Sequence, residues 1–510
     1  MKRRARAFGK ILVANRGEIA VRVIRACREL GRSAVAVFSE ADRAALHVLL
    51  ADEAQPLGPS PAHESYLSVE RVLAAARACG AEAVHPGYGF LAENARFARA
   101  CEEAGLAFIG PRWQTIALLG EKTSARREAV AAGLPVVPGS LEALADEPSL
   151  RREAERVGYP VMLKAAAGGG GKGLRLVASA AELASALERA RSEARGAFGD
   201  DRVYLEQALT RPRHVEIQVF GDGHGNVVQL FERECSIQRR HQKLIEESPS
   251  PFVTPGLRQQ LGELAVALAR RVGYVGAGTL EFLVDAERRP FFLEMNTRLQ
   301  VEHAVTELVT GTDLVVAQIL VAEGEALPFR QQELRQRGHA IECRVYAEDP
   351  AAGFLPSPGK ILALRTPGGP GVRDDSGVYE GWTVPIDYDP LLSKLVVWAE
   401  SREAAIRRMR RALGEYRVVG VRTTLPFLER SLADPAFAAG DFDTSFVERL
   451  CARAEPVGER PLALAVAVAA VRAFRQRQGS LAGQASADRG GSPWRLAGLR
   501  EAHGGRLGGC

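Results

Sequence analysis

The sequence predicts a multidomain protein that combines an α/β unit with α+β units. Three observations predict this fold class. Residues 10–39 follow a strand, helix, strand pattern, residues 159–296 contain several β segments and a Gly-rich turn, and residues 339–367 alternate β segments with proline and glycine. A length of 510 residues is compatible with roughly three domains on the usual size prior.

The first predicted domain spans residues 1–120. KILVA, residues 10–14, is typical of a buried parallel strand, and the NRG turn after it leads into apolar residues at helical spacing that Gly31 ends. SAVAVFS is the next strand, so the segment is a βαβ unit of a doubly wound sheet. The first loop has Gly17 but no GxGxxG pattern, so an NAD site is not indicated.

The second predicted domain, residues 121–335, is rich in antiparallel strands. YPVMLKAAAGGGGKGLRLV, residues 159–177, predicts two strands joined by a Gly-rich turn. VYLEQAL, RHVEIQV, VVQLFEREC, GTLEFLVD and FFLEMN predict further strands of an antiparallel sheet. SIQRRHQKLIEE, residues 236–247, is expected to be a basic loop that follows a strand.

The third predicted domain, residues 336–450, is a separate β-rich unit. HAIECRVYAEDP and FLPSPGKILALRTP are its strand segments, bounded by proline and glycine clusters. Residues 451–510 form an Ala-, Gly- and Ser-rich tail. Its apolar stretch at residues 461–471 is too short to span a bilayer and is expected to be a helix that packs on another surface.

Composition excludes several classes of protein. Apolar residues make up 46% and charged residues 25% of the chain, which is ordinary for a globular protein and unlike a disordered or fibrous one. A net charge of +5 is small for this length, so nucleic-acid binding is not indicated. Seven scattered cysteines without a CxxC pair fit a reducing compartment, and no secretory signal is evident. We therefore expect a cytoplasmic protein without a membrane segment.

The segment EMNTRLQVEH, residues 294–303, is the most informative part of the chain. On a strand with a period of two, Glu294, Asn296 and Arg298 would share one face, with Glu302 just beyond it. Such a group is costly to bury unless a divalent cation and an anionic substrate compensate its charges. The segment therefore predicts a metal and phosphate site.

A second acid strengthens this prediction. Glu281 and Glu294 lie on strands that a short turn could make antiparallel neighbours, so both carboxylates could reach one site. Facing carboxylates repel unless a cation lies between them, and oxygen ligands that include Asn296 suit Mg²⁺. The alternative is a surface salt-bridge cluster with Arg298.

Lysine is rare in this chain, which contains 67 lysines and arginines together. A compact ammonium differs from a planar guanidinium, so the retained lysines are informative unless their retention is random. Several lie in or beside Gly-rich or His-rich motifs. The eight lysines are Lys2, Lys10, Lys122, Lys164, Lys172, Lys243, Lys360 and Lys394.

The Gly-rich turn has the composition of a phosphate-binding loop. The glycines at 168–171 and Gly173 free backbone amides to surround phosphate oxygens, while Lys164 and Lys172 supply positive charge. The spacing is not GxxxxGK[ST], which disfavours a P-loop NTPase. A flexible hairpin without a ligand is the alternative, as a solvated face is for the basic stretch at residues 236–247.

Eight motifs in order resemble one family. KILVANRGEIA, HPGYGFLAEN, KAAAGGGGKG, RHVEIQV, QRRHQK, EMNTRLQVEH, ECRVYAEDP and FLPSPG resemble biotin carboxylase, the ATP-grasp component of biotin-dependent acyl-CoA carboxylases. The resemblance covers residues 8–448. It implies an ATP-grasp fold with an N-terminal Rossmann-like (pre-ATP-grasp) domain, a flexible lid at about residues 138–208 and a C-terminal β-rich biotin carboxylase domain.

The resemblance also implies a role for each matching residue. ATP would be held by Lys122, Lys164, Gly170, Gly171, Glu206, Gln207, Ala208, Leu209, His214, His241, Glu281 and Glu294. Two Mg²⁺ or Mn²⁺ ions would be held by Glu281, Glu294 and Asn296. Bicarbonate would be bound by Lys243, Arg298, Gln300 and the amide of Val301, and Glu302 would take its proton. Arg344 would stabilise the biotin enolate, with Tyr88 near the biotin ring.

Biotin is attached to a lysine, and no lysine follows Lys394. The chain is therefore expected to receive biotin from another polypeptide, a biotin carboxyl carrier protein, or to be a shortened α subunit. Carboxyltransferase subunits and a second copy in a homodimer are the other expected partners. Two alternatives remain at this point: another ATP-grasp ligase of the carbamoyl-phosphate synthase type, and a non-catalytic ATP-binding scaffold.

Overall fold

The structure is a computed structural model that describes residues 7–140, 144, 146–165, 174–453 and 471–472. The chain divides into two units, and the elements described below belong to residues 1–450, apart from the end of the last helix. Most of the helix predicted at residues 461–471, and all the glycines at 168–173, lie outside the described residues. Within the described part, no single helix has the length and composition to cross a membrane; one helix pair passes that test jointly but is bent by 96°.

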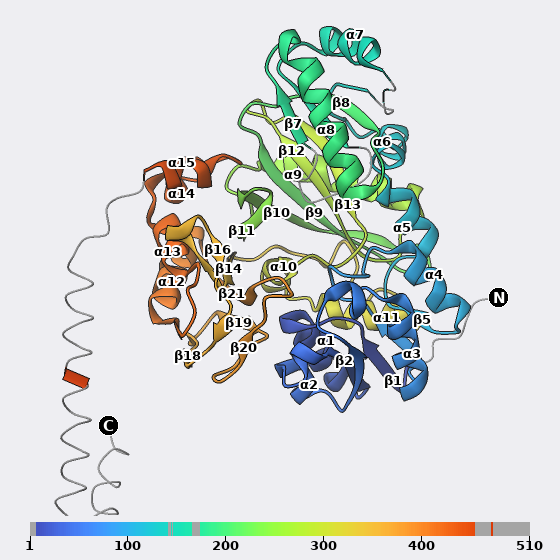
Figure 1. The fold of residues 1–510 in the computed structure, drawn as a ribbon, viewed down its shortest axis with the longest axis vertical. Helices are drawn as coiled ribbons and strands as arrows, with labels where there is room; N and C mark the ends of the chain where they lie inside the picture. Colours follow the sequence, from blue (N-terminus) through green and yellow to red (C-terminus); the bar gives the residue numbers. More distant parts are fainter. Residues whose placement is uncertain (1–6, 141–143, 145, 166–173, 454–470, 473–510) are drawn as a thin grey trace, which may run out of the picture. The chain divides into compact units, whose positions relative to one another are not determined.

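The N-terminal sheet confirms the predicted doubly wound unit. Its five strands are parallel in the order β3-β2-β1-β4-β5 (Figure 1). The strands are β1 (Lys10–Val13), β2 (Ser33–Ser39), β3 (Glu53–Gly58), β4 (Ala83–His85) and β5 (Ala107–Phe108). The helices are α1 (Gly17–Glu29), α2 (Leu46–Leu50), α3 (Val69–Cys79), α4 (Ala95–Glu103) and α5 (Trp113–Gly120). The strand order reverses between β1 and β4, which is where open α/β sheets present ligand-binding loops.

A small three-stranded sheet forms the next layer, shown in green at the top of Figure 1. Its order is β7-β6-β8, from β6 (Val161–Ala165), β7 (Leu174–Val177) and β8 (Val203–Gln207). Helices α7 (Glu147–Val157) and α8 (Leu183–Phe198) pack on it, whereas α6 (Lys122–Ala131) packs on the larger sheet described next. The prediction that VYLEQ belongs with the strands that follow it is wrong. Leu205 packs with Leu163 and Leu187 in a separate small core, so β8 pairs with β6.

One eight-stranded antiparallel sheet occupies the centre, in the order β13-β12-β9-β10-β11-β14-β21-β19. Its strands are β9 (Arg213–Gly221), β10 (Val227–Arg239), β11 (Gln242–Ser248), β12 (Gly276–Val284), β13 (Pro290–Asn296), β14 (His339–Tyr346), β19 (Val372–Ser376) and β21 (Leu391–Ala399). Strands β14, β19 and β21 come from the region predicted as a C-terminal β-rich unit, and they continue the sheet of the preceding region. Buried residues on β11 and β14 pair in register, as Ile245 does with Cys343, so the two regions share one sheet.

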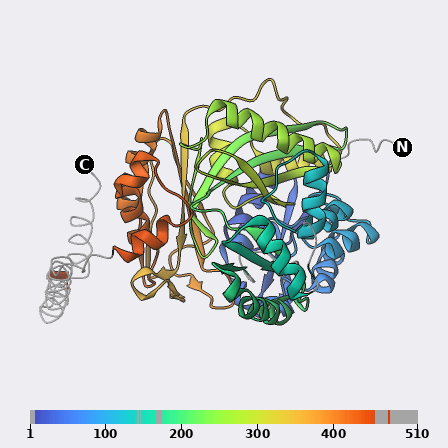
Figure 2. The same cartoon turned by 90° about the horizontal axis from the view of Figure 1, so that it is seen from above.

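Helices pack on both faces of the C-terminal half of this sheet. Figure 2 shows the C-terminal helices, in orange, along one side of its strands. Ile341, Cys343 and Val397 pack with α12 (Arg402–Glu415) and α13 (Leu425–Ala433), whereas Ala340 and Val396 pack with α10 (His303–Thr310). Because side chains alternate along a strand, Glu342, Arg344 and Lys394 are on the α10 face. The other helices are α9 (Pro255–Arg271), α11 (Leu314–Ala322), α14 (Pro435–Ala439) and α15 (Phe446–Ala452). Short strands are β15 (Glu348–Asp349), β16 (Leu355–Pro356), β17 (Gly359–Lys360), β18 (Ala363–Arg365), β20 (Thr383–Val384) and β22 (Arg417–Val419).

The basic stretch at residues 236–247 is a hairpin, so the prediction of a loop is wrong. Strand β10 continues to Arg239, and β11 begins at Gln242. The two residues between them, Arg240 and His241, have φ of 49° and 66°. Positive φ at both central positions is the geometry of a type I′ turn, which usually recruits Asn-Gly. The Arg-His pair gave no such signal.

Candidate active site

A row of charged residues crosses four strands of the central sheet. Arg233 of β10 pairs in register with Glu216 of β9, Glu216 with Glu281 of β12, and Glu281 with Glu294 of β13. Directly opposite residues share a face of a sheet, so three carboxylates lie side by side. The prediction that Glu281 and Glu294 are antiparallel neighbours is confirmed.

Lys243 on β11 is the central cation. Its Nζ lies 2.6 Å from Glu216 Oε2, 2.9 Å from Glu281 Oε1 and 2.6 Å from Glu302 Oε1. Burial opposes the charge on this ammonium, but the three carboxylates outweigh burial and raise the pKa of Lys243 well above its ordinary value. Lys243 is therefore a charged, fully saturated hydrogen-bond donor.

Glu302, immediately before α10, is fully buried between two cations. Its Oε1 accepts from Lys243, and its Oε2 accepts from Arg344 Nη2 at 3.0 Å. Burial alone would raise the pKa of Glu302, but Lys243 and then Arg344 lower it well below its ordinary value. The carboxylate is ionised, and its basicity depends on how firmly these two cations hold it.

Arg344 on β14 connects Glu302 to a further acid. Its Nε donates to Glu246 Oε1 at 2.6 Å. Burial raises the pKa of Glu246 to about 7, although Arg344 opposes the rise. Glu342, the cross-strand partner of Glu246, is also buried, and neither of its carboxylate oxygens has a hydrogen-bond partner within the described chain.

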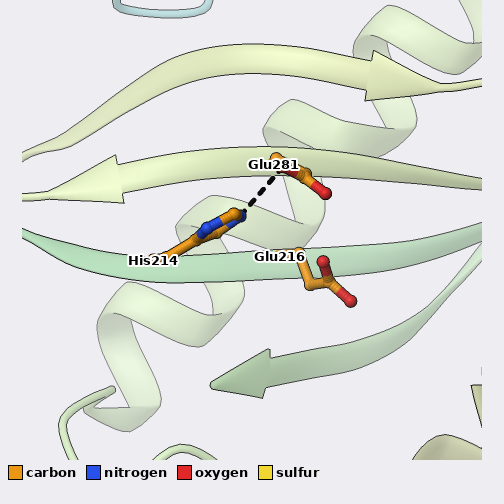
Figure 3. Close-up of side chains that lie close together, drawn as sticks. All are labelled: His214, Glu216 and Glu281. Carbon is orange, nitrogen blue, oxygen red and sulfur yellow. Dashed lines mark ion pairs between the residues drawn. The ribbon is translucent and has the colours of Figure 1, made fainter. Parts of the chain in front are cut away.

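Glu281 is the most heavily contacted acid of the row. Its Oε1 accepts from Asn296 Nδ2 at 2.9 Å and from Gln300 Nε2 at 3.2 Å, and its Oε2 lies 2.9 Å from His214 Nε2. Figure 3 shows His214 and Glu216 on one strand, with Glu281 on the next strand reached by the His214 ion pair. Each of these three residues offers one atom that could bind a metal ion, and the three atoms lie within 4.8 Å of one another.

Glu294 differs because its carboxylate has no hydrogen bond or ion pair with any described residue. Burial and the neighbouring Glu281 raise the pKa of Glu294 above its ordinary value. A cation placed against Glu281 and Glu294 would remove the repulsion that causes part of this rise. The donor set of two carboxylates and the Asn296 amide oxygen therefore fits Mg²⁺, which prefers few protein carboxylates.

Arg298 lies past the end of β13, because the strand ends at Asn296 instead of continuing as predicted. Its Nη2 still donates to Asn296 Oδ1 at 3.2 Å, and its Nη1 donates to Gln300 Oε1 at 2.9 Å. Its Nε donates to Glu93 Oε2 at 2.8 Å, which brings a loop of the N-terminal sheet to this site. The guanidinium is positioned for an anion beside Gln300.

A second cluster lies between the small sheet and the acidic row. Glu206 forms buried ion pairs with Lys164 and Arg126. The pKa of Lys122 lies below its ordinary value, mainly because the ammonium is buried. Glu294 raises this pKa and Lys164 lowers it further. Lys122 and Lys164 are thus close enough to repel, which an anionic phosphate would relieve.

The remaining predicted ATP residues divide into three groups. At the end of β8, the backbone N–H of Gln207 donates to the carbonyl oxygen of Pro138, and that of Ala208 donates to the carbonyl oxygen of Pro160. Leu209 is the next residue. His241 lies at the hairpin tip, where partial desolvation of its ring and then nearby His214 lower its pKa. Gly170 and Gly171 lie outside the described residues.

Two further predicted site residues are Tyr88, in the N-terminal domain, and Val301, between β13 and α10. The Tyr88 hydroxyl donates to Glu18 in the first turn of α1. The carbonyl oxygen of Val301 accepts from Lys394 Nζ at 2.7 Å. Tyr88 and Val301 are therefore both anchored by buried charged groups.

Sequence reasoning missed Glu216, Glu246, Arg233 and Glu93. A signal for Glu216 was present, because RHVEIQV alternates His214, Glu216 and Gln218 with apolar residues. All three polar side chains are buried. Their common face indicates a polar site within the sheet, whereas Glu246 and Glu93 required the tertiary fold.

Fold and site together define an ATP-grasp enzyme, in which a small sheet and a larger antiparallel sheet enclose lysines and paired acids. Three family models match: "Biotin carboxylase, N-terminal domain" at residues 7–116, "Carbamoyl-phosphate synthase L chain, ATP binding domain" at 121–330, and "Biotin carboxylase C-terminal domain" at 342–449. The two flanking models exclude a carbamoyl-phosphate synthase.

Similar proteins agree with this class. The chain is 53% identical over 441 residues to a subunit of pyruvate carboxylase from Methanothermobacter thermautotrophicus, covering 86% of this chain and 90% of that protein. It is 52% identical over 440 residues to biotin carboxylase of Halalkalibacterium halodurans, covering 86% and 97%. The chain therefore belongs to the biotin carboxylase family and is an ATP-dependent ligase.

Solved structures show the same fold. The biotin carboxylase domain of Hydrogenobacter thermophilus 2-oxoglutarate carboxylase, solved as a dimer with MgADP, ADP and bicarbonate, has a TM-score of 0.85 at 48% identity, covering 88% of this chain and 100% of that one. Biotin carboxylase from Campylobacter jejuni has a TM-score of 0.85 at 47% identity, covering 87% and 99%.

Proposed function

We propose that this chain catalyses the first half-reaction of an acyl-CoA carboxylase. A bicarbonate oxygen attacks the γ-phosphorus of ATP, the bond to ADP breaks, and carboxyphosphate forms. Carboxyphosphate then breaks into carbon dioxide and phosphate. N1 of biotin, on a separate carrier protein, gives its proton to the released phosphate and forms a bond to the carbon dioxide. The observation that supports this most directly is the contact of Lys243 with both the acidic row and Glu302.

The nucleotide end of the site is assigned to the acidic row and the lysines. Lys122 and Lys164 would bind phosphates together with Gly170 and Gly171, while Glu206, Gln207, Ala208, Leu209, His214 and His241 would complete the ATP site. Glu281, Glu294 and Asn296 would hold two Mg²⁺ or Mn²⁺ ions. Such ions neutralise phosphate charge, and phosphoryl transfer needs little else beyond positioning.

Bicarbonate is assigned to Arg298, Gln300, the amide of Val301 and Lys243. Glu302 would take its proton, which makes the anion a better nucleophile. A bicarbonate oxygen that replaces Glu302 as the partner of Lys243 would release one of the two cations that depress the pKa of Glu302. Substrate binding would thereby increase the basicity of Glu302 where the proton must be received.

The biotin end is assigned to Arg344 and Tyr88. The N1 hydrogen of biotin is weakly acidic, so charge develops on the ureido oxygen as the proton leaves. Arg344 would stabilise that oxygen, and one preorganised donor contributes about 3 kcal/mol to such a transition state. Its bond to Glu246 fixes the guanidinium orientation in advance.

The partners are proposed from the relatives. These include the alpha chain of propionyl-CoA carboxylase from Ruegeria pomeroyi and the mitochondrial methylcrotonoyl-CoA carboxylase alpha component of Mus musculus. A biotin carboxyl carrier protein, carboxyltransferase subunits and a homodimer fit this context. A cytoplasmic location is proposed separately, from the scattered cysteines without a CxxC pair. The domain limits near residues 120, 335 and 450 also remain proposals.

The test is ADP formation by the purified chain with Mg-ATP, bicarbonate and free biotin. We expect turnover that needs both bicarbonate and biotin and that ammonia does not stimulate. Glu302→Gln should abolish it with nucleotide binding retained, whereas Glu325→Gln, at an exposed site, should match the wild type. A rate of ADP formation that does not depend on biotin, or normal turnover of the Glu302→Gln variant, would contradict the proposal.

A further inference from the structure

Lys394 is a retained lysine that the proposed reaction leaves without a role. It lies on β21, its side chain is fully buried, and it faces α10. Its cross-strand partner on β14 is Arg344. Burying a lysine is costly unless its ammonium has partners, so its contacts indicate why it is there.

The Lys394 ammonium contacts groups from two distant parts of the chain. Its Nζ donates to the carbonyl oxygen of Val301 at 2.7 Å and lies 3.3 Å from Glu18 Oε1. The same Glu18 oxygen accepts the hydroxyl of Tyr88, and Lys394 Nζ lies 5.9 Å from the centre of the Tyr88 ring. Asp375 is a more distant partner at 3.9 Å.

These contacts form a continuous series of polar interactions that runs from Tyr88 through Glu18 and Lys394 to the Val301 carbonyl. The carbonyl belongs to the peptide that joins Val301 to Glu302. Holding this oxygen therefore restrains the direction in which the Glu302 side chain leaves the backbone. At the other end of this series, the contact with Glu18 restrains the Tyr88 ring.

We propose that Lys394 is a positioning residue. It couples the loop of residues 298–302, which contains most of the residues assigned to bicarbonate, to the biotin side of the site. This inference rests on the proposed function, because it uses the roles given there to Val301, Glu302 and Tyr88. A displacement of Tyr88 would shift the Glu302 backbone through the Lys394 ammonium, and a displacement of that backbone would shift Tyr88 in the same way. A compact point charge suits this position, since a guanidinium is larger and its donors are fixed in a plane.

The primary experiment compares Lys394→Met with Lys360→Met, because Lys360 is exposed on β17. We expect Lys394→Met to raise KM for bicarbonate and KM for free biotin together by about tenfold or more, as for loss of a buried charged hydrogen bond. KM for ATP should stay within about twofold, because Lys394 does not contact the acidic row. Unchanged KM for bicarbonate and biotin, with only a lower melting temperature, would overturn the inference.

A double-mutant cycle with Tyr88→Phe tests the coupling itself. Tyr88→Phe removes the hydroxyl that binds Glu18, so it should raise KM for bicarbonate although Tyr88 lies on the biotin side. In the Lys394→Met background the same change should add little, because the connection is already broken. Additive effects on KM for bicarbonate would contradict coupling through Lys394.

Two further results keep the outcomes separate. If Lys394→Met does not fold, Glu18→Met removes the acceptor oxygen shared by Tyr88 and Lys394 and should raise KM for bicarbonate on its own. An unchanged KM in a folded Glu18→Met protein would overturn the inference. A wild-type protein without bicarbonate-dependent ADP formation would instead overturn the proposed function.

Discussion

Lys243 and Glu302 form a buried ion pair with 2.6 Å between Nζ and Oε1. The same ammonium contacts Glu216 and Glu281, so one side chain links the acidic row to the residue assigned as the base. Charge neutralisation at the acids and basicity at Glu302 are consequently interdependent.

The first prediction concerns this link. Lys243→Met should lower bicarbonate-dependent turnover by about a hundredfold or more, the scale for removing one preorganised charged donor. It leaves three buried carboxylates without their shared cation, so the melting temperature should also fall. Steady-state ADP release and thermal unfolding measure the two effects. Turnover within about tenfold of wild type in the folded variant would refute the assignment.

The second prediction concerns Glu216. Arg233 has no exposed surface, and its guanidinium donates to Glu216 as well as to Gln218 Oε1. Glu216→Gln leaves Arg233 and Lys243 with one anion fewer, and breaking a buried ion pair costs about 3 kcal/mol or more. Denaturant unfolding should show this loss. A change below about 0.5 kcal/mol, as expected for an exposed glutamate such as Glu325, would argue against it.

The third prediction concerns divalent ions. Glu294→Gln should raise the Mg²⁺ concentration for half-maximal ADP formation by about tenfold or more, because it removes a charged ligand. Glu287→Gln, in the exposed turn between β12 and β13, is the matched control and should leave this value unchanged. A chelator should abolish activity reversibly. Equal Mg²⁺ dependence in the two variants would remove Glu294 from the metal site.

The fourth prediction concerns pH. Burial raises the pKa of Glu246 from 4.5 to about 7, so the folded state binds this proton more tightly than the unfolded state. The resulting stabilisation is fully present below pH 4.5 and is lost as the pH rises to about 7. Glu246→Gln has no such proton, so its stability relative to wild type should rise across this window by up to about 1.4 kcal/mol per pH unit. Urea unfolding at several pH values tests this, and a constant difference would disprove it.

Local patterns in the sequence were sufficient for part of the site. Glu281 and Glu294 could be paired because a short turn joins their strands and so fixes their register. Lys243 and Arg344 could be singled out only as candidates. Their contacts depend on the order of strands in the sheet, in which β9, β10 and β11 separate β12 from β14. No local pattern encodes that order.

The differences in fold have similar causes. The Arg240-His241 turn was missed because neither residue favours positive φ, and the hairpin there depends on long-range pairing of both strands. Strand β14 was assigned to a separate unit because proline and glycine clusters follow it. Those clusters mark short peripheral strands, whereas β14 itself continues the central sheet.

The continuous eight-stranded sheet has a mechanical consequence. Glu294 on β13 and Lys394 on β21 belong to a single hydrogen-bonded sheet. Movements that admit nucleotide or a biotinylated partner can therefore occur in the surrounding layers without changing the separation between the phosphate end and the carboxyl-accepting end. The pairing of the strands sets the distance between the two ends of the active site, so this distance does not have to be re-established at each turnover.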